Sequence, residues 1–205
     1  MANKPFTGVV KCLKNGIYRI YERWFGLDTP TDNLSRNAFA YTTDMVGYAP
    51  SDWLTAKRLD KIIRFSPTDV FADFGSGKGK MVFLAARYPF KKVIGIEISR
   101  HLHDIAQKNI EHTRKTFACS QVELIHMDVL DYQIPDDLTI AYFFNPFVNE
   151  IFTGVINHIH ESFIRTPRPM WIAYKNPIMR HHLDTCPWLE FKRLYHNIAF
   201  YRTHI

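Results

Sequence analysis

The sequence predicts an α/β domain with a seven-stranded, mostly parallel sheet, helices on both faces and an antiparallel C-terminal hairpin. Three observations predict this fold. From residue 70 onward, short apolar runs rich in β-branched and aromatic residues alternate with longer stretches of helical spacing. A glycine-rich turn joins the first run to the first of these helices. The last two runs flank His196-Asn197, a pair typical of a tight turn. Alternating strands and helices require crossover connections, and therefore a parallel sheet covered on both faces.

The first fifty residues are predicted to form an N-terminal helical extension, followed by the main domain over residues 51–205. Apolar residues recur at helical spacing from about Thr7 to Phe25, with basic residues mostly between them. A basic amphipathic helix either packs on its own domain, which is the commoner use, or makes a weak peripheral contact with a membrane surface. Residues 28–50 are rich in Thr, Asp, Asn, Tyr and Pro, which predicts a loop or a broken helix.

The elements of the main domain follow in order. A helix is expected from Ser51, an N-cap candidate after Pro50, to about Phe65, where Ser66-Pro67 ends it. Five strands are then expected, at Val70–Phe74, Val93–Glu97, Val122–Ile125, Ile140–Phe144 and Trp171–Tyr174. Helices are expected between them, near Lys80–Tyr88, His101–Lys115 and Glu150–Arg165. The hairpin is expected over Leu189–Tyr195 and Ile198–His204.

Composition narrows the class of protein. A hydrophobic fraction of 46% and a charged fraction of 22% are typical of a soluble globular domain. The N-terminal residues lack the apolar core of a signal peptide, so a cytoplasmic protein is expected. The three cysteines are far apart and show no metal-ligand spacing, so no metal site is expected. The net charge of +6 is a weak indication of an anionic partner such as nucleic acid.

The glycine-rich turn, Asp73-Phe74-Gly75-Ser76-Gly77-Lys78-Gly79-Lys80, is the sharpest signal. Glycines there let the backbone approach a ligand closely, at a helix N-terminus that supplies free N–H groups. A nucleoside triphosphate loop would need Ser or Thr where Met81 stands, and the dinucleotide fingerprint would need glycine at Lys80. Asp73 would repel a pyrophosphate but attract a cationic amine. S-adenosylmethionine, which carries an ammonium, a sulfonium and no phosphate, is therefore the favoured ligand.

Two further acids follow neighbouring strands. Glu97 ends the second strand, eighteen residues after Gly79, where a ribose-binding acid belongs in this topology. Asp128 follows the third strand, where it can accept a hydrogen bond from an adenine amine; an ordinary loop acid is the alternative. The predicted cofactor-binding residues are Asp73, Gly75, Ser76, Gly77, Gly79, Glu97, Ile98, Asp128, Val129 and Asn145.

Asn145-Pro146-Phe147 follows the fourth strand, at the sheet edge where ligands bind in open α/β sheets. A rigid Asn-Pro turn can present the Asn145 amide oxygen and nearby carbonyls to an incoming amine, with Phe147 as a packing wall. An ordinary turn after a strand is the alternative.

This set of ordered motifs resembles the class I, Rossmann-like S-adenosylmethionine-dependent methyltransferases over roughly residues 48–205. Within that class, Gly47-Tyr48-Ala49-Pro50, the glycine loop, Pro89-Phe90 and Asn145-Pro146-Phe147 are similar to a largely uncharacterised bacterial group. The motif order is also similar to that of the non-SET protein-lysine methyltransferases. The single proline after Asn145 departs from the Asn-Pro-Pro-[Tyr/Phe] of methyltransferases acting on amides and exocyclic base amines.

The resemblance implies a methyltransferase that uses S-adenosyl-L-methionine, with residues 1–50 as a lid over the methionine end of the cofactor. The expected acceptor is a nitrogen, a protein lysine or another amine before RNA. A Rossmann-like NAD(P)-binding oxidoreductase is a further alternative. The expected catalytic residues are Asn145, Pro146, Phe147 and Tyr48. Tyr48, His126 or bulk water could take the proton of an amine acceptor.

Overall fold

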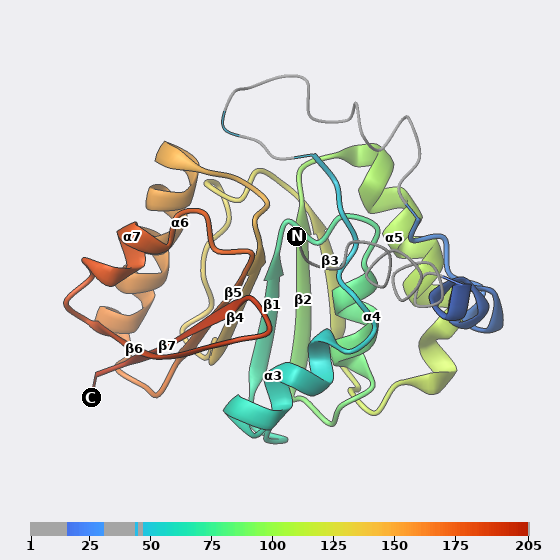
Figure 1. The fold of residues 1–205 in the computed structure, drawn as a ribbon, viewed down its shortest axis with the longest axis horizontal. Coiled ribbons are helices and arrows are strands. Elements are labelled where there is room, and N and C mark those ends of the chain that lie inside the picture. The colour runs from blue at the N-terminus through green and yellow to red at the C-terminus, as the bar shows by residue number, and fades with distance from the viewer. Residues whose placement is uncertain (1–15, 31–43, 45–46, 205) are drawn as a thin grey trace, which may run out of the picture.

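The computed structural model describes residues 16–30, 44 and 47–204, and its centre is a seven-stranded sheet (Figure 1). The strand order is β3-β2-β1-β4-β5-β7-β6. The first five strands pair in parallel, while β7 runs antiparallel to both β5 and β6. The order reverses between β1 and β4, which opens a crevice at the carboxyl ends of these two strands.

The elements agree closely with the predicted ones. The strands are β1 Val70–Phe74, β2 Lys92–Glu97, β3 Val122–His126, β4 Ile140–Phe144, β5 Trp171–Lys175, β6 Leu189–Tyr195 and β7 Ile198–Thr203. The helices of the main domain are α3 Thr55–Ile63, α4 Lys80–Ala86, α5 Arg100–Thr113, α6 Asn149–Arg165 and α7 Arg180–Asp184, with a 3-10 turn over Arg114–Thr116. The seven-stranded α/β fold predicted from the sequence is confirmed.

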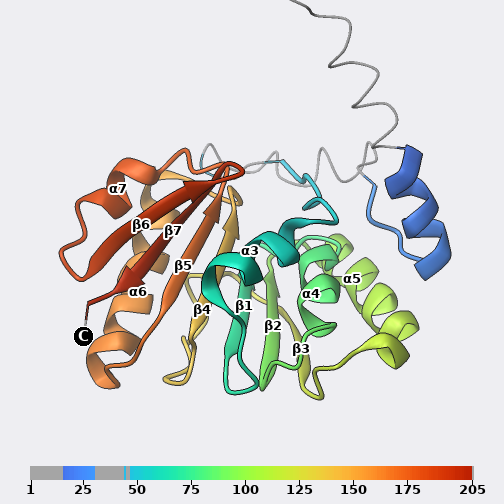
Figure 2. The ribbon, with the colours of Figure 1, turned by 60° about the horizontal axis from the view of Figure 1, so that its bottom comes forward.

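Each face of the sheet has its own hydrophobic core. Successive residues of β1 and β4 point to opposite faces, and nearly all of them are buried because both faces are covered. Phe71 and Tyr142 pack toward α3 and α4, whereas Phe74 and Phe143 pack toward α6. Figure 2 shows α3, α4 and α5 together on one face and α6 on the other. The two cores hold the strand ends in fixed positions, on which the site described below depends.

Two local expectations are corrected. Ser51 does not cap α3, because its hydroxyl lies 2.8 Å from the Tyr142 hydroxyl, and the helix begins after Leu54 without a side-chain cap. The second concerns α7, where no helix was expected: this helix has only five residues and is too short to show helical periodicity.

The N-terminal extension is described in part. Residues 16–25 form a helix that lies outside α5 in both views (Figures 1 and 2). It packs on the domain through Phe25, whose ring centroid is 5.2 Å from that of Phe83. The predicted start of this helix, at residues 7–15, and most of the predicted loop lie outside the described residues. No helix within the described ranges is long and apolar enough to cross a bilayer.

Candidate functional site

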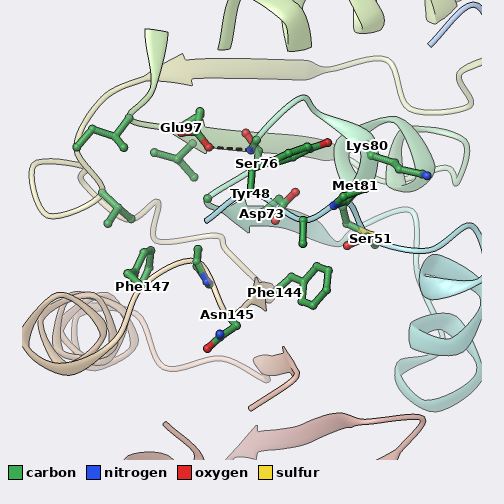
Figure 3. A pocket seen from close by; sticks show the side chains of 18 of the residues that line it. Tyr48, Ser51, Asp73, Ser76, Lys80, Met81, Glu97, Phe144, Asn145 and Phe147 are labelled. Atoms are coloured by element: carbon green, nitrogen blue, oxygen red, sulfur yellow. Dashed lines mark hydrogen bonds between the residues drawn. The ribbon is translucent and has the colours of Figure 1, made fainter. Parts of the chain in front are cut away.

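A cavity opens at the carboxyl ends of the central parallel strands, where the strand order reverses (Figure 3). Including its open mouth, it holds about 810 Å³ of empty space, a size that suits a nucleoside-sized ligand. Its walls come from residues 47–51, the glycine loop, and the segments that follow β2, β3 and β4. The cavity brings together every predicted site residue except Gly79.

The glycine loop owes its shape to close contacts. Gly75 and Gly77 have φ of +82° and +55°, which favours glycine. A Cβ on Gly75 would lie 2.3 Å from Pro146 Cβ, and one on Gly77 would lie 2.4 Å from the Tyr48 ring. The loop is thus packed between Tyr48 and Pro146, two residues that the sequence placed in the acceptor region. Gly79 instead faces Ala106 of α5 and lets α4 and α5 approach each other.

Glu97 fixes the loop from the end of β2. Its carboxylate is buried and accepts hydrogen bonds from the backbone N–H of Gly77 at 2.7 Å and of Ser99 at 2.8 Å. Each of its oxygens keeps a second lone pair, as a pair of ribose hydroxyls would need. Burial raises the pKa of Glu97, while the backbone hydrogen bonds oppose that rise.

Asp73 is a buried carboxylate at the end of β1, only 3% exposed. Burial, and the nearby charge of Glu97, raise its pKa well above the ordinary value of an aspartate. Its side chain has neither a hydrogen-bonding nor a cationic partner within the described ranges. The hydroxyl of Ser76, one turn further along the loop, is likewise buried without a partner there. A buried carboxylate and a buried hydroxyl without partners suit a ligand that brings an ammonium group and other polar atoms into the cavity.

The opposite end of the cavity is mainly apolar. Ile98, Met127 and Val129 form this wall, with Asp128 at its edge. One oxygen of Asp128 accepts a hydrogen bond from the backbone N–H of Leu130 at 2.9 Å, so it also stabilises its own turn. An apolar slot with a carboxylate at its rim suits a flat heteroaromatic ring that carries an exocyclic amine.

Asn145 is held in an unusual conformation at the end of β4. It has φ of +46°, and its side-chain oxygen accepts a hydrogen bond from the Tyr174 hydroxyl at 3.1 Å. Figure 3 shows this side chain directed away from Glu97 and Asp73. The amide oxygen that was predicted to meet an amine therefore already accepts a hydrogen bond from Tyr174 of β5. Only its second lone pair is left to accept one from the amine that is to be methylated. Phe147 is buried beside Phe143 and walls this end of the cavity.

Tyr48 and His126, two of the three candidate proton acceptors, lie in surroundings that the sequence did not indicate. The Tyr48 hydroxyl donates a hydrogen bond to the Thr29 carbonyl at 2.8 Å. Burial and the acids around it, Glu22 foremost, raise the pKa of Tyr48 well above its usual value. It is therefore protonated at neutral pH and cannot act as a base there. His126 is exposed, outside the cavity lining, with Nε2 at 3.0 Å from the Ile98 carbonyl oxygen.

Two buried lysines of the glycine loop tie the N-terminal extension to the site, a feature that the sequence analysis missed. Lys80 Nζ is 2.8 Å from Glu22 and 4.9 Å from the centroid of the Trp53 ring. Lys78, fully buried, lies 3.3 Å from Asp28 and donates to the Pro30 carbonyl at 2.9 Å. Buried lysines are rare unless paired, so these contacts fix residues 22–30 against the loop. They also cross the predicted domain boundary near residue 50.

The other lining residues that were not predicted as site residues are Gly47, Ala49, Pro50, Ser51, Met81, Ile96, Met127, Phe144 and Ile151. Most are apolar, and nothing in their sequence pattern separates a cavity wall from ordinary core. Among the described residues, no group of three or more His, Cys, Asp or Glu side chains could hold a metal ion.

The chain is similar in sequence to known methyltransferases. Residues 51–133 match the family model described as histone methylation protein DOT1. A histone-lysine N-methyltransferase, H3 lysine-79 specific, of Dictyostelium discoideum is 45% identical over 49 residues, covering 24% of this chain and 3% of that protein. A protein-lysine N-methyltransferase of Saccharolobus islandicus (strain REY15A) is 26% identical over 107 residues, covering 52% of this chain and 65% of that protein. An rRNA adenine N-6-methyltransferase of Escherichia coli is 28% identical over 94 residues, covering 44% of this chain and 36% of that protein. The matched regions thus span less than two thirds of each relative.

The fold is also found among solved structures. An RNA methyltransferase from Salinibacter ruber, crystallised with S-adenosyl-L-homocysteine, superimposes with a TM-score of 0.52 at 20% identity. The match covers 76% of this chain and 92% of that one. At this identity the similarity concerns the fold alone.

Proposed function

We propose that this chain, which has the fold of the class I S-adenosylmethionine-dependent methyltransferases, binds S-adenosylmethionine in the cavity and methylates a nitrogen acceptor. A protein lysine or another amine is favoured over RNA. The observation that carries the proposal is Asp73, a buried carboxylate at the switch point of the sheet without a cationic partner among the described residues. A cationic, phosphate-free ligand supplies that partner.

The cavity residues fit the cofactor end by end. Asp73, the loop backbone and Ser76 would hold the ammonium and the methionine part, and Glu97 the ribose hydroxyls. Asp128 would meet the adenine amine, with Ile98 and Val129 against the ring. When bound, the cofactor supplies a methyl group on a positively charged sulfur. The work left to the protein is to align the acceptor and exclude water, which supplies on the order of 7–11 kcal/mol in well-aligned intramolecular reactions.

The acceptor is expected between residues 47–50 and Asn145-Pro146-Phe147, which line the cavity from opposite sides. The position of residues 47–50 supports the proposed role of the N-terminal extension as a lid. Asn145 acts there as a positioning residue held by Tyr174. Because Tyr48 is protonated and His126 lies outside the cavity, we propose that the acceptor loses its proton to water.

Two observations bear on the identity of the acceptor. The Dictyostelium discoideum and Saccharolobus islandicus relatives carry the names of lysine methyltransferases, and the family model that of a histone methylation protein, which supports an amine acceptor. The positive net charge and the Escherichia coli relative keep RNA as the second candidate. Lys80, in place of a third fingerprint glycine, and Asp73, two residues before the first glycine, disfavour the NAD(P)-binding alternative.

Calorimetry with S-adenosylhomocysteine and with NADH tests the proposed cofactor. We expect binding of the first and none of the second, and the reverse result would overturn the proposal. Transfer of a tritiated methyl group, assayed on purified histone, free polyamine and ribosomal RNA, then identifies the class of acceptor. If the label appears in RNA alone, the acceptor is RNA and not a protein or small-molecule amine.

Tyr48→Phe is expected to leave the pH dependence of methyl transfer unchanged, because Tyr48 does not exchange a proton near neutral pH. Removing the hydroxyl costs only its hydrogen bond to the Thr29 carbonyl, a loss of about 1 kcal/mol in stability. The pH–rate profile checks this. If the acidic or basic limb of the pH–rate profile disappears in Tyr48→Phe, Tyr48 is the base after all.

Asn145→Ala is expected to lower turnover at least about tenfold while S-adenosylhomocysteine affinity stays within about twofold, because the acceptor but not the cofactor loses its guide. Tyr174→Phe should give a smaller decrease, since Asn145 then keeps its oxygen but loses its anchor. Single-turnover rates and calorimetry on the same samples separate the two effects. Full turnover in Asn145→Ala would remove this residue from the acceptor site.

A further inference from the structure

The helix over residues 16–25 carries an apolar stripe that faces solvent. Ile17, Ile20 and Trp24 are 52%, 63% and 80% exposed, and Tyr21 beside them is 47% exposed. Spacings of three and four residues place these side chains on one side of the helix. Single exposed apolar residues are ordinary, but a continuous stripe marks an interaction surface. Figure 2 shows the helix at the rim of the molecule, outside α5.

The other side of the helix is fixed to the domain. Glu22 is buried in its ion pair with Lys80, and Phe25 packs on Phe83 and Trp53. Turning the helix to bury the stripe would strand the Lys80 ammonium, itself only 4% exposed, without its carboxylate. The stripe is therefore held outward by the same contacts that anchor the extension.

The helix that carries the stripe and the sequence before it are basic. Arg19 and Arg23 are exposed on the same helix, and the fifteen residues before it contain three lysines and no acid. Glu22 is the sole acid among residues 1–27, and its charge is paired inside the protein. An apolar stripe with Trp and Tyr, flanked by arginines, has the composition of helices that lie in the headgroup region of membranes.

We propose that this helix docks the protein on an anionic lipid surface. Ile17, Ile20 and Trp24 would enter the boundary between headgroups and acyl chains, and Arg19 and Arg23 would contact lipid phosphates. A second copy of the chain is a poorer occupant, because pairing two such faces would bring like charges together. The proposal stands apart from the proposed methyl transfer and does not require it.

Sedimentation with lipid vesicles tests the proposal on the full chain. Vesicles of phosphatidylcholine alone are compared with vesicles in which about a third of the lipid is phosphatidylglycerol. We expect binding to the anionic vesicles, weakened by salt. Ile20→Glu/Trp24→Glu and Arg19→Gln/Arg23→Gln should each lower the partition coefficient about tenfold or more. Ile164→Glu on α6 is the matched control, because Ile164 is 62% exposed, and its binding should equal that of the wild type.

The results distinguish a lipid surface from a second copy of the chain as the partner of the stripe. A blue shift of tryptophan emission on anionic vesicles, reduced in Trp24→Phe, would place this side chain in lipid. Absence of wild-type binding, or an equal loss in Ile164→Glu, would overturn the proposal. So would light scattering that shows a wild-type dimer converted to monomer by Trp24→Glu. Thermal unfolding verifies that each variant is folded, so weak binding is not mistaken for misfolding.

Discussion

Glu97→Ala is expected to lower the affinity for S-adenosylhomocysteine at least about a hundredfold. Each hydrogen bond from a ribose hydroxyl to a charged oxygen contributes about 1.5–3 kcal/mol, and two are lost. The same carboxylate holds the backbone N–H groups of Gly77 and Ser99, so the variant also loosens the glycine loop. Isothermal calorimetry measures the affinity.

Two variants sharpen this result. Glu97→Gln keeps one acceptor oxygen but places an N–H₂ group against a backbone donor, so an intermediate loss is expected. Glu111→Ala removes an exposed acid from α5 and should bind like the wild type. Unchanged affinity in Glu97→Ala would show that the ligand does not reach the end of β2, and the cofactor assignment would fail with it.

Asp73→Asn is expected to weaken binding at least about tenfold, because the ammonium of the ligand loses its charged partner. The unliganded variant should nevertheless be more stable than the wild type at neutral pH. A carboxyl group whose pKa is raised by folding stabilises the protein below its unfolded pKa, and this contribution is lost as the pH rises through the folded pKa. Asparagine is neutral throughout, so it avoids the cost of the buried charge.

The sign of the pH dependence follows from the same shift. Wild-type affinity for S-adenosylhomocysteine should rise with pH as Asp73 ionises, and the Asp73→Asn profile should be flatter, over the pH range in which both proteins stay folded. Thermal unfolding of the unliganded proteins over this range measures the stability difference, which should shrink toward acid pH. Asp131→Asn, the same change at an exposed loop, serves as the control. A variant less stable than the wild type at neutral pH would show that Asp73 has a hidden cationic partner.

Local sequence was enough to predict most of the fold. The strands of the parallel sheet appear as short continuous apolar runs, because both faces of the sheet are covered, and β1 and β4 match the predicted bounds residue for residue. The glycine loop and Glu97 could be placed together because the topology brings the ends of neighbouring parallel strands to one edge. Their specific roles in binding stay predictions.

The features of the site that could not be predicted are contacts between polar side chains that lie far apart in the sequence. Nothing near Lys80 indicates that its ammonium is buried, because the carboxylate that permits burial is Glu22, 58 residues earlier. The Asn145 amide is likewise engaged by Tyr174 from the next strand, 29 residues on. Pairings of polar side chains across elements follow from the packed structure and leave no periodic signal.

The pairing of the two loop lysines with the N-terminal extension also sets an order of events during synthesis. Glu22 and Asp28 are translated before their partners, which follow 58 and 50 residues later. Until β1 and α4 have been made and have docked, the extension lacks the cations that anchor it. The extension thus emerges from the ribosome before the loop that anchors it. At translation rates of about 5–20 residues per second, the docking side of its helix, with Glu22 and Phe25, lacks its partners for several seconds.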